Sequence, residues 1–201
     1  MKESADMSSG NELFPVFLKL NDLHLLLVGA GNIGLEKLVA IVKNSPKTTI
    51  TVVAEEISDG VKELGGNYPN ITLLQKSFEP GDLDEADIVF VAANNPHLDR
   101  IIKEEARNRK LLVNFADKPV LCDFYLGSVV QKGSLKLGIS TNGKSPTIAK
   151  RLKEVLDDAL PEELEEALAN LNEIRNMLQG DFSNKVKKLN EITEILITKK
   201  K

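Results

Sequence analysis

The stretch Leu25-Leu26-Leu27-Val28-Gly29-Ala30-Gly31-Asn32-Ile33-Gly34 decides the fold, because a short apolar run leads directly into the pattern GxGxxG. An apolar run of this length is typical of a buried strand, and the residues after it have helical spacing. At such a junction the first glycine permits a tight turn, the second lets a pyrophosphate approach the backbone, and the third lets helix and strand pack closely. The stretch therefore predicts a dinucleotide site with Gly29, Gly31 and Gly34 at the N-terminus of a helix. A purely structural glycine turn is the alternative.

Four more apolar runs follow at residues 49–54, 71–74, 88–93 and 111–115, with helices expected to start near Ile33, Ile57 and Leu98. The runs are mostly continuous rather than alternating, as in strands that helices cover on both faces. The alternation of strand and helix predicts an α/β fold with a Rossmann-type parallel sheet. Residues 15–20 alternate and precede Asn21-Asp22, which predicts an additional edge strand hairpinned onto this sheet.

The pattern changes after Phe115. Runs 124–131 and 134–140, separated by Lys132-Gly133, predict a β-hairpin. A turn at 141–146 then leads into a helix, with Ser145 as N-cap and Pro146 at the first helical position. The remaining chain is expected to be helical, with breaks at Leu160-Pro161 and Gln179-Gly180. Apolar residues spaced for packing on another helix are Leu164, Leu168, Leu171, Ile174 and Leu178.

Length and composition place the 201-residue chain in the soluble globular class, with 42% hydrophobic and 28% charged residues. No apolar run approaches the roughly 20 residues of a membrane span. The polar, acidic first 12 residues predict a disordered leader without a secretory or transit signal, and so a cytoplasmic protein. One cysteine and two histidines exclude a disulfide framework and argue against a preformed metal site. The net charge of −4 gives no support to nucleic-acid binding.

An acidic pair, Glu55-Glu56, follows the second predicted strand. In dinucleotide-binding folds a carboxylate at this point, about 20 residues beyond the glycine loop, binds the ribose. Glu55 could accept a hydrogen bond from the 2′-hydroxyl and would repel a 2′-phosphate, so the pattern favours NAD over NADP. A solvated helix start is the alternative interpretation of the pair.

Asp117 lies just beyond the fifth predicted strand, in the block Asn114-Phe115-Ala116-Asp117-Lys118-Pro119. Ligands of open α/β sheets bind beyond the carboxyl ends of the strands, which places Asp117 at the expected crevice. There a carboxylate could accept a proton from a substrate or orient a metal ion arriving from solution. Ordinary turn chemistry is the alternative. Simpler roles are expected for His97 at the surface, His24 at a strand entrance and Cys122 as a packed residue.

Basic residues crowd the predicted hairpin and the helix after it, against the acidic balance of the whole chain. A polycarboxylate ligand would need such a cluster, although solvation is the default role for any one surface lysine. These residues are Lys132, Lys136, Lys144, Lys150 and Arg151.

Four blocks together resemble the precorrin-2 dehydrogenases, the stand-alone counterparts of the N-terminal module of bacterial sirohaem synthase. The glycine loop is shared by many nucleotide binders, whereas the other three blocks together are much more specific. The blocks are LFPVFLKL at 13–20, the glycine loop with Glu36-Lys37, NFADKP at 114–119 and GISTNGKSP at 138–146. They occur in family order, and the resemblance extends over residues 13–178.

The resemblance implies NAD-dependent oxidation of precorrin-2 to sirohydrochlorin, and in bifunctional members the insertion of Fe²⁺ to give sirohaem. It also implies a homodimer held by the hairpin and helical region. By position, Asp117 matches the essential carboxylate of the family. The expected NAD contacts are Asn32, Ile33, Glu55 and Glu56, and the expected substrate contacts are Asn114, Ser140, Thr141, Lys144 and Ser145.

Two departures from the family pattern stand out. The family loop is typically GGG followed by x-V-A and a basic pair, where this chain has Gly29-Ala30-Gly31-Asn32-Ile33-Gly34-Leu35-Glu36-Lys37. In the later turn the second glycine is kept as Gly143, but the first is Asn142, which still tolerates a left-handed backbone. With so few histidines and cysteines, we expect dehydrogenation as the main activity and weak or absent iron insertion.

The predicted organisation is a leader at 1–12, an NAD-binding domain at 13–117, a hairpin dimerisation segment at 118–146 and a helical domain at 147–201. A rival hypothesis is an NAD-sensing regulatory module, similar to the domains attached to potassium channels and transporters, which needs no catalytic carboxylate. The Asp117 block and the Ser145-Pro146 turn argue against it. A third hypothesis, a structural scaffold with a degenerate fold, is opposed by the intact glycine loop.

Overall fold

The computed structural model describes residues 10–161, 164–177 and 182–193. The described residues divide into two compact units, one comprising residues 14–126 and the other residues 10–13 together with those from 127 onward. Residues 118–126, assigned above to the hairpin segment, therefore lie in the same unit as the sheet. The hairpin and the helices that follow it belong together in the second unit.

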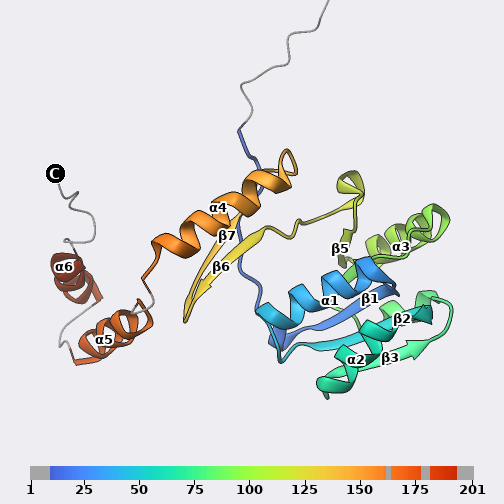
Figure 1. Cartoon of the computed structure of the whole chain (residues 1–201), viewed down its shortest axis with the longest axis horizontal. Coiled ribbons are helices and arrows are strands. Elements are labelled where there is room, and N and C mark those ends of the chain that lie inside the picture. Colours follow the sequence, from blue (N-terminus) through green and yellow to red (C-terminus); the bar gives the residue numbers. More distant parts are fainter. Residues whose placement is uncertain (1–9, 162–163, 178–181, 194–201) are drawn as a thin grey trace, which may run out of the picture. The chain divides into compact units, whose positions relative to one another are not determined.

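The first unit is built on a five-stranded parallel sheet with the strand order β3-β2-β1-β4-β5 (Figure 1). This confirms the predicted Rossmann-type sheet. Its strands are β1 (His24–Ala30), β2 (Thr49–Ile57), β3 (Ile71–Gln75), β4 (Ile88–Val91) and β5 (Leu112–Phe115). The connecting helices are α1 (Asn32–Asn44), α2 (Asp59–Asn67) and α3 (Pro96–Asn108). The 3₁₀ turns are η1 (Leu20–Asp22), η2 (Pro80–Leu83) and η3 (Pro119–Leu121).

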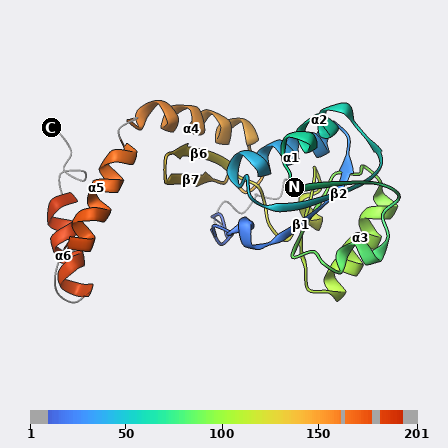
Figure 2. The ribbon, with the colours of Figure 1, turned by 90° about the horizontal axis from the view of Figure 1, so that it is seen from below.

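The apolar run of β1 is continuous because helices cover both faces of the sheet (Figure 2). Leu25 and Leu27 pack in one core cluster with residues of α1 and α2, such as Leu38. Leu26 packs in the other cluster with residues of α3, such as Ile102. Successive side chains of a strand point to opposite faces, so each face of β1 contributes to its own core.

The predicted edge strand at residues 15–20 is wrong. Residues 15–19 belong to no strand, and Leu20 begins η1. The side chains of Phe14, Val16 and Phe17 are 86%, 60% and 72% exposed. β-propensity depends on context, and residues 15–19 pair with neither edge of the sheet, because β3 pairs with β2 alone and β5 with β4 alone.

The second unit contains the antiparallel hairpin of β6 (Ser128–Lys132) and β7 (Leu135–Ile139), followed by α4 (Pro146–Ala159), α5 (Leu164–Met177) and α6 (Phe182–Thr193). Lys132 pairs with Leu135, so the turn residues are Gly133-Ser134, one position later than predicted. Gly133 has φ +54°, a conformation that favours glycine. Ser145 caps α4 as predicted, its Oγ accepting from the Ile148 N–H at 3.2 Å. The predicted break at Gln179-Gly180 lies outside the described residues.

None of the described helices is both long and apolar enough to cross a membrane.

Candidate functional site

The glycine loop joins β1 to α1, and its three glycines differ in what a side chain at their position would contact. Gly29 has φ +101°, and a Cβ there would lie 2.6 Å from the backbone of Ala92, which directly follows β4. A Cβ on Gly34 would collide with the Gly29 carbonyl, so this glycine lets α1 pack on β1. Gly31 has open space where a Cβ would lie. Only Gly31 therefore lacks a packing requirement, and the open space beside it would let a phosphate approach the backbone.

The N-terminus of α1 is suited to an anion. Gly31 is the N-cap residue, and no side chain caps the first turn. The Gly31 carbonyl accepts from the Leu35 N–H at 2.9 Å, which leaves the N–H groups of Asn32, Ile33 and Gly34 without helical acceptors. With the helix dipole, these donors favour a pyrophosphate. The residues present thus fit a dinucleotide.

Glu55 and Glu56 lie in the last residues of β2, which continues to Ile57, and α2 begins only at Asp59. The alternative of a solvated helix start is therefore wrong. The Glu55 Oε1 accepts a hydrogen bond from the Ser77 hydroxyl at 2.7 Å, which orients the exposed carboxylate. Lys76, which precedes Ser77 in the chain, forms ion pairs with Glu79 at 3.1 Å and Asp82 at 2.8 Å.

Asp117 lines a small pocket of about 50 Å³ at the carboxyl ends of β4 and β5. Its backbone is left-handed, with φ +57°, and its side chain is exposed. Among the described residues no group donates to or pairs with its carboxylate. The pocket also contains Ile33 from the first turn of α1, so the glycine loop and Asp117 meet at one place. The remaining lining residues are Val91, Ala92, Ala93, Asn94, Asp99, Ala116 and Lys118.

No functional role was predicted from the sequence for three polar lining residues, Asn94, Asp99 and Lys118. Asn94 is also left-handed, with φ +46°. Asp99 is buried in the first turn of α3 and forms an ion pair with Lys118, which follows Asp117. The sequence signal for Asn94 was its place after β4. Asp99 and Lys118 lie 19 positions apart in the sequence, and this spacing gave no signal of their contact.

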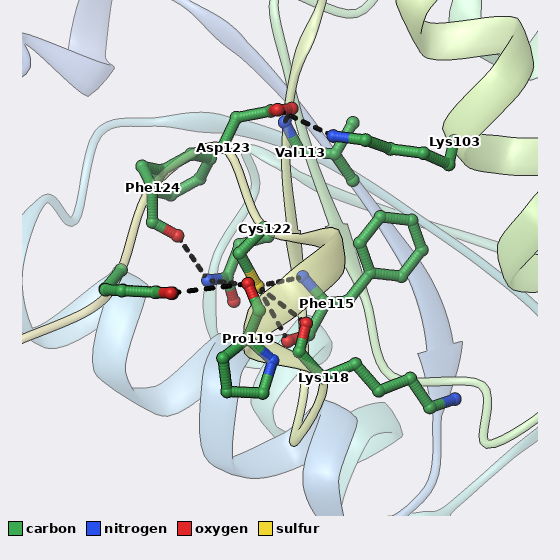
Figure 3. Close-up of polar contacts among 10 residues, drawn as sticks. Lys103, Val113, Phe115, Lys118, Pro119, Cys122, Asp123 and Phe124 are labelled. Carbon is green, nitrogen blue, oxygen red and sulfur yellow. Dashed lines mark hydrogen bonds and ion pairs between the residues drawn. The ribbon is translucent and has the colours of Figure 1, made fainter. Parts of the chain in front are cut away.

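The connection after β5 is held by a group of polar contacts around Cys122 (Figure 3). The Cys122 thiol donates to the Phe115 carbonyl and accepts from the Phe115 N–H, both at 3.2 Å. Burial raises the pKa of the Cys122 thiol, which fits the predicted packing role. Asn114 is buried, and its amide donates to the Phe124 carbonyl at 2.8 Å. Asp123 accepts from the Val113 N–H at 3.0 Å and pairs with Lys103 at 2.6 Å.

We expected Asn114 to contact substrate. In the structure its amide instead donates to the Phe124 carbonyl in the connection after β5. The other expected substrate residues lie in the second unit, in the turn between β7 and α4. Thr141 and Ser145 hydrogen-bond to one another, with the Thr141 Oγ1 accepting from the Ser145 N–H at 3.2 Å. Ser140 accepts from the Asn142 N–H at 3.2 Å, and Lys144 is exposed.

Neither His24 nor His97 lines the pocket that contains Asp117. His24 lies at the start of β1, where its ring nitrogens contact the Glu85 carbonyl at 3.0 Å and the Thr51 hydroxyl at 2.8 Å. This confirms a structural role. His97 is exposed, as predicted. In the part of the chain that the structure describes, no three His, Cys, Asp or Glu side chains are grouped so as to hold a metal ion.

Two family models match the chain. The family described as "Putative NAD(P)-binding" matches residues 16–128, and that described as "Sirohaem biosynthesis protein central" matches residues 132–159. The first match contains the glycine loop and Asp117. The second contains most of the hairpin and all of α4.

Curated relatives and a solved structure agree with these matches. A sirohaem synthase of Pseudoalteromonas atlantica is 31% identical over 153 residues, which cover 76% of this chain and 32% of the relative. A sirohaem synthase of Methylobacillus flagellatus is 31% identical over 173 residues, covering 86% and 36%. The chain thus spans about a third of these relatives. A precorrin-2 dehydrogenase, SirC, superimposes with a TM-score of 0.71 at 28% identity, covering 90% of this chain and 89% of that one.

Proposed function

The chain belongs to the NAD(P)-binding family that forms the N-terminal module of sirohaem synthase, and from this premise we propose that it oxidises precorrin-2 to sirohydrochlorin with NAD⁺. The likeness to a precorrin-2 dehydrogenase along nine-tenths of both chains supports this substrate. The rival hypothesis, a regulatory module without catalysis, leaves this likeness unexplained.

One observation carries the proposal: the exposed carboxylate of Asp117 and the first turn of α1 line the same pocket. A dehydrogenation that creates a carbon–carbon double bond removes a hydride from one atom and a proton from its neighbour. NAD⁺, when bound, accepts the hydride. The chain itself must then supply a base next to the nicotinamide, and the pocket that Asp117 shares with the first turn of α1 supports Asp117 in this role.

Different residues of the chain bind the cofactor and accept the proton. The N–H groups of Asn32, Ile33 and Gly34 bind the pyrophosphate, and Gly31 leaves room for it. Glu55, oriented by Ser77, accepts from the ribose 2′-hydroxyl. Asp117 accepts the proton at a carboxylate oxygen. Because no described neighbour occupies this carboxylate, it is available to the substrate.

The test incubates the purified protein with precorrin-2 and NAD⁺ under anaerobic conditions while following NADH absorbance and the spectrum of the macrocycle. Stoichiometric formation of NADH and sirohydrochlorin is the expected result. Binding of NAD⁺ without turnover would favour the regulatory module instead. A parallel incubation with sirohydrochlorin and Fe²⁺, compared with a protein-free control, measures whether iron insertion accompanies the main activity.

We further propose that the chain acts as a homodimer through its second unit. On α4 the side chains of Ile148, Leu152 and Val155 are 56%, 45% and 62% exposed, and their spacing of four and three residues places them on one helix face. On α5 the predicted stripe is half-buried at Leu164, Leu168, Leu171 and Ile174, while Leu178 lies outside the described residues. An apolar stripe of this kind is typical of an interface.

A cytoplasmic location belongs to the same proposal. The chain's one cysteine, Cys122, is a free thiol. Free thiols persist in reducing compartments, where disulfides are rare.

A further inference from the structure

The ion pair between Lys118 and Asp99 stands beside the proposed base and is not explained by cofactor binding. Asp99 lies in the first turn of α3 and is 2% exposed, and Lys118 directly follows Asp117 in the chain. Both side chains line the pocket that contains Asp117. The pair thus joins the loop that bears the base to a helix on one face of the sheet.

A buried carboxylate is strongly unfavourable unless a cation and hydrogen bonds compensate it. Among the described residues Lys118 is the one cation that pairs with Asp99. Moving Lys118 away would leave that carboxylate buried and unpaired. The Lys118 ammonium is therefore held against α3.

The backbone on both sides of Asp117 is hydrogen-bonded, whereas no described residue pairs with its carboxylate. The Ala116 N–H donates to the Val91 carbonyl at 2.9 Å, which ties the preceding residue to β4. The Lys118 carbonyl accepts from the Leu121 N–H at 3.0 Å. Between these points Asp117 has the left-handed φ of +57°, which an aspartate tolerates but which costs energy relative to the right-handed region, so the surroundings must support it.

We propose that the Lys118–Asp99 ion pair positions Asp117 for proton transfer by holding its left-handed turn against α3. In this proposal Lys118 and Asp99 are positioning residues, because they act through Asp117. This inference rests on the proposed function, since it assigns the pair to the same proton-transfer step. A displacement of about 1 Å at a catalytic group can reduce turnover by about a hundredfold, so holding the Asp117 turn in place should increase turnover.

The chain supplies a matched control. Lys103, also on α3, pairs with Asp123 at 2.6 Å and so ties the same helix to the same connection. Figure 3 shows Lys103 and Lys118 at opposite ends of the group of contacts around Cys122. The two ion pairs have the same chemistry, but only Lys118 adjoins Asp117. Loss of the Lys103 pair should therefore leave catalysis unchanged.

The experiment compares Lys118→Met with Lys103→Met in the full chain. Each substitution is made alone and in combination with Asp117→Asn. With Asp117 present, Lys118→Met should lower kcat by about 10–100-fold and change KM for NAD⁺ by less than about twofold. In the Asp117→Asn background the same change should cost less than about twofold, because the carboxylate to be positioned is gone. A merely structural role would cost the same in both backgrounds.

Two further measurements keep the inference testable. The double variant Asp99→Asn/Lys118→Met removes both charges, so it carries the kinetic test if Lys118→Met alone does not fold. Crystal structures of the wild type, Lys118→Met and Lys103→Met report the Asp117 turn without any turnover. The turn should shift or become mobile in Lys118→Met alone.

The outcomes separate the two proposals. A wild-type protein that does not oxidise precorrin-2 overturns the proposed function, and the crystal structures still decide whether the pair holds the turn. An active wild type in which Lys118→Met matches Lys103→Met in kcat overturns the positioning role only. An unchanged Asp117 turn in crystals of Lys118→Met overturns it as well.

Discussion

At the scale of single residues, Asp117 has the left-handed backbone and the exposed carboxylate of an ordinary turn residue, but it also lines the pocket beside α1, which a turn does not require. Asp117→Asn should keep the fold and NAD⁺ binding, because the amide has nearly the same shape. It should lower dehydrogenation by roughly 10²–10⁴-fold, the range of general acid–base catalysis. Steady-state kinetics and NAD⁺ titration measure both effects. Wild-type turnover in this variant would reduce Asp117 to a turn residue.

The glycines of the loop allow a paired test of binding against folding. Gly31→Ala places a methyl group in open space at a φ of −81°, which alanine adopts readily, so the free protein should melt at nearly the wild-type temperature. NAD⁺ binding should fall sharply, since the methyl group occupies the path of the phosphates. Gly34→Ala should instead destabilise the fold, because its Cβ collides with the Gly29 carbonyl. Thermal melting with and without NAD⁺ distinguishes the two.

Cofactor choice should follow the charges at the end of β2. Glu55 is oriented by Ser77, and the nearby cation Lys76 is engaged by Asp82 and Glu79, hydrogen bonds that raise its pKa. A 2′-phosphate would therefore be repelled by the Glu55 carboxylate. Lys76, which is already paired with Asp82 and Glu79, would not compensate this repulsion. We expect kcat/KM to be higher with NAD⁺ than with NADP⁺, and Glu55→Gln to narrow the difference. Equal turnover with both cofactors in the wild type would contradict this prediction.

At the scale of elements, the hairpin turn is joined to α5 through one carboxylate. Glu165 accepts from the Ser134 hydroxyl at 2.9 Å and from the Ser134 N–H. These hydrogen bonds lower the pKa of Glu165. A carboxyl whose pKa is lowered by folding stabilises the contact above its unfolded pKa and loses it as the pH falls through the folded value.

The contact between the hairpin turn and α5 should therefore weaken below about pH 4. The measurement is hydrogen exchange of the Ser134 amide by NMR, corrected for intrinsic exchange, over a pH series. Glu165→Gln serves as the control, because its neutral amide oxygen still accepts a hydrogen bond and does not titrate. A protection factor for Ser134 that is flat across this range in the wild type would rule out the coupling.

At the scale of the whole molecule, the apolar face of α4 should hold two copies together. Leu152→Asp places a charge in the proposed interface, where full burial of one leucine contributes roughly 1.5–3 kcal/mol. We expect the wild type to have dimeric mass at micromolar concentration and the variant to be shifted to monomer. Val39, a similarly exposed apolar residue on α1, provides the control variant Val39→Asp. A monomeric wild type in analytical ultracentrifugation would refute the dimer.

The sequence by itself determined the sheet, the glycine loop and the helical second half, because each depends on residues near one another in the chain. The run at 25–28, the glycines after it and Ser145 before Pro146 each specify a local geometry whatever surrounds them. The family resemblance added the role expected of Asp117. These features required only local spacing and residue type.

Only the tertiary structure decided which distant residues meet. Residues 15–20 have the alternation of a strand but pair with neither edge of the sheet, and residues 15–19 are exposed. Ser77 orients Glu55, and Asp99 pairs with Lys118, across 22 and 19 positions of sequence. Burial of Asp99 in the first turn of α3 is what makes its pairing obligatory, and burial is set by the packing of helices on the sheet. Such contacts leave no periodic trace in the sequence, because their partners are brought together by the fold and not by spacing along the chain.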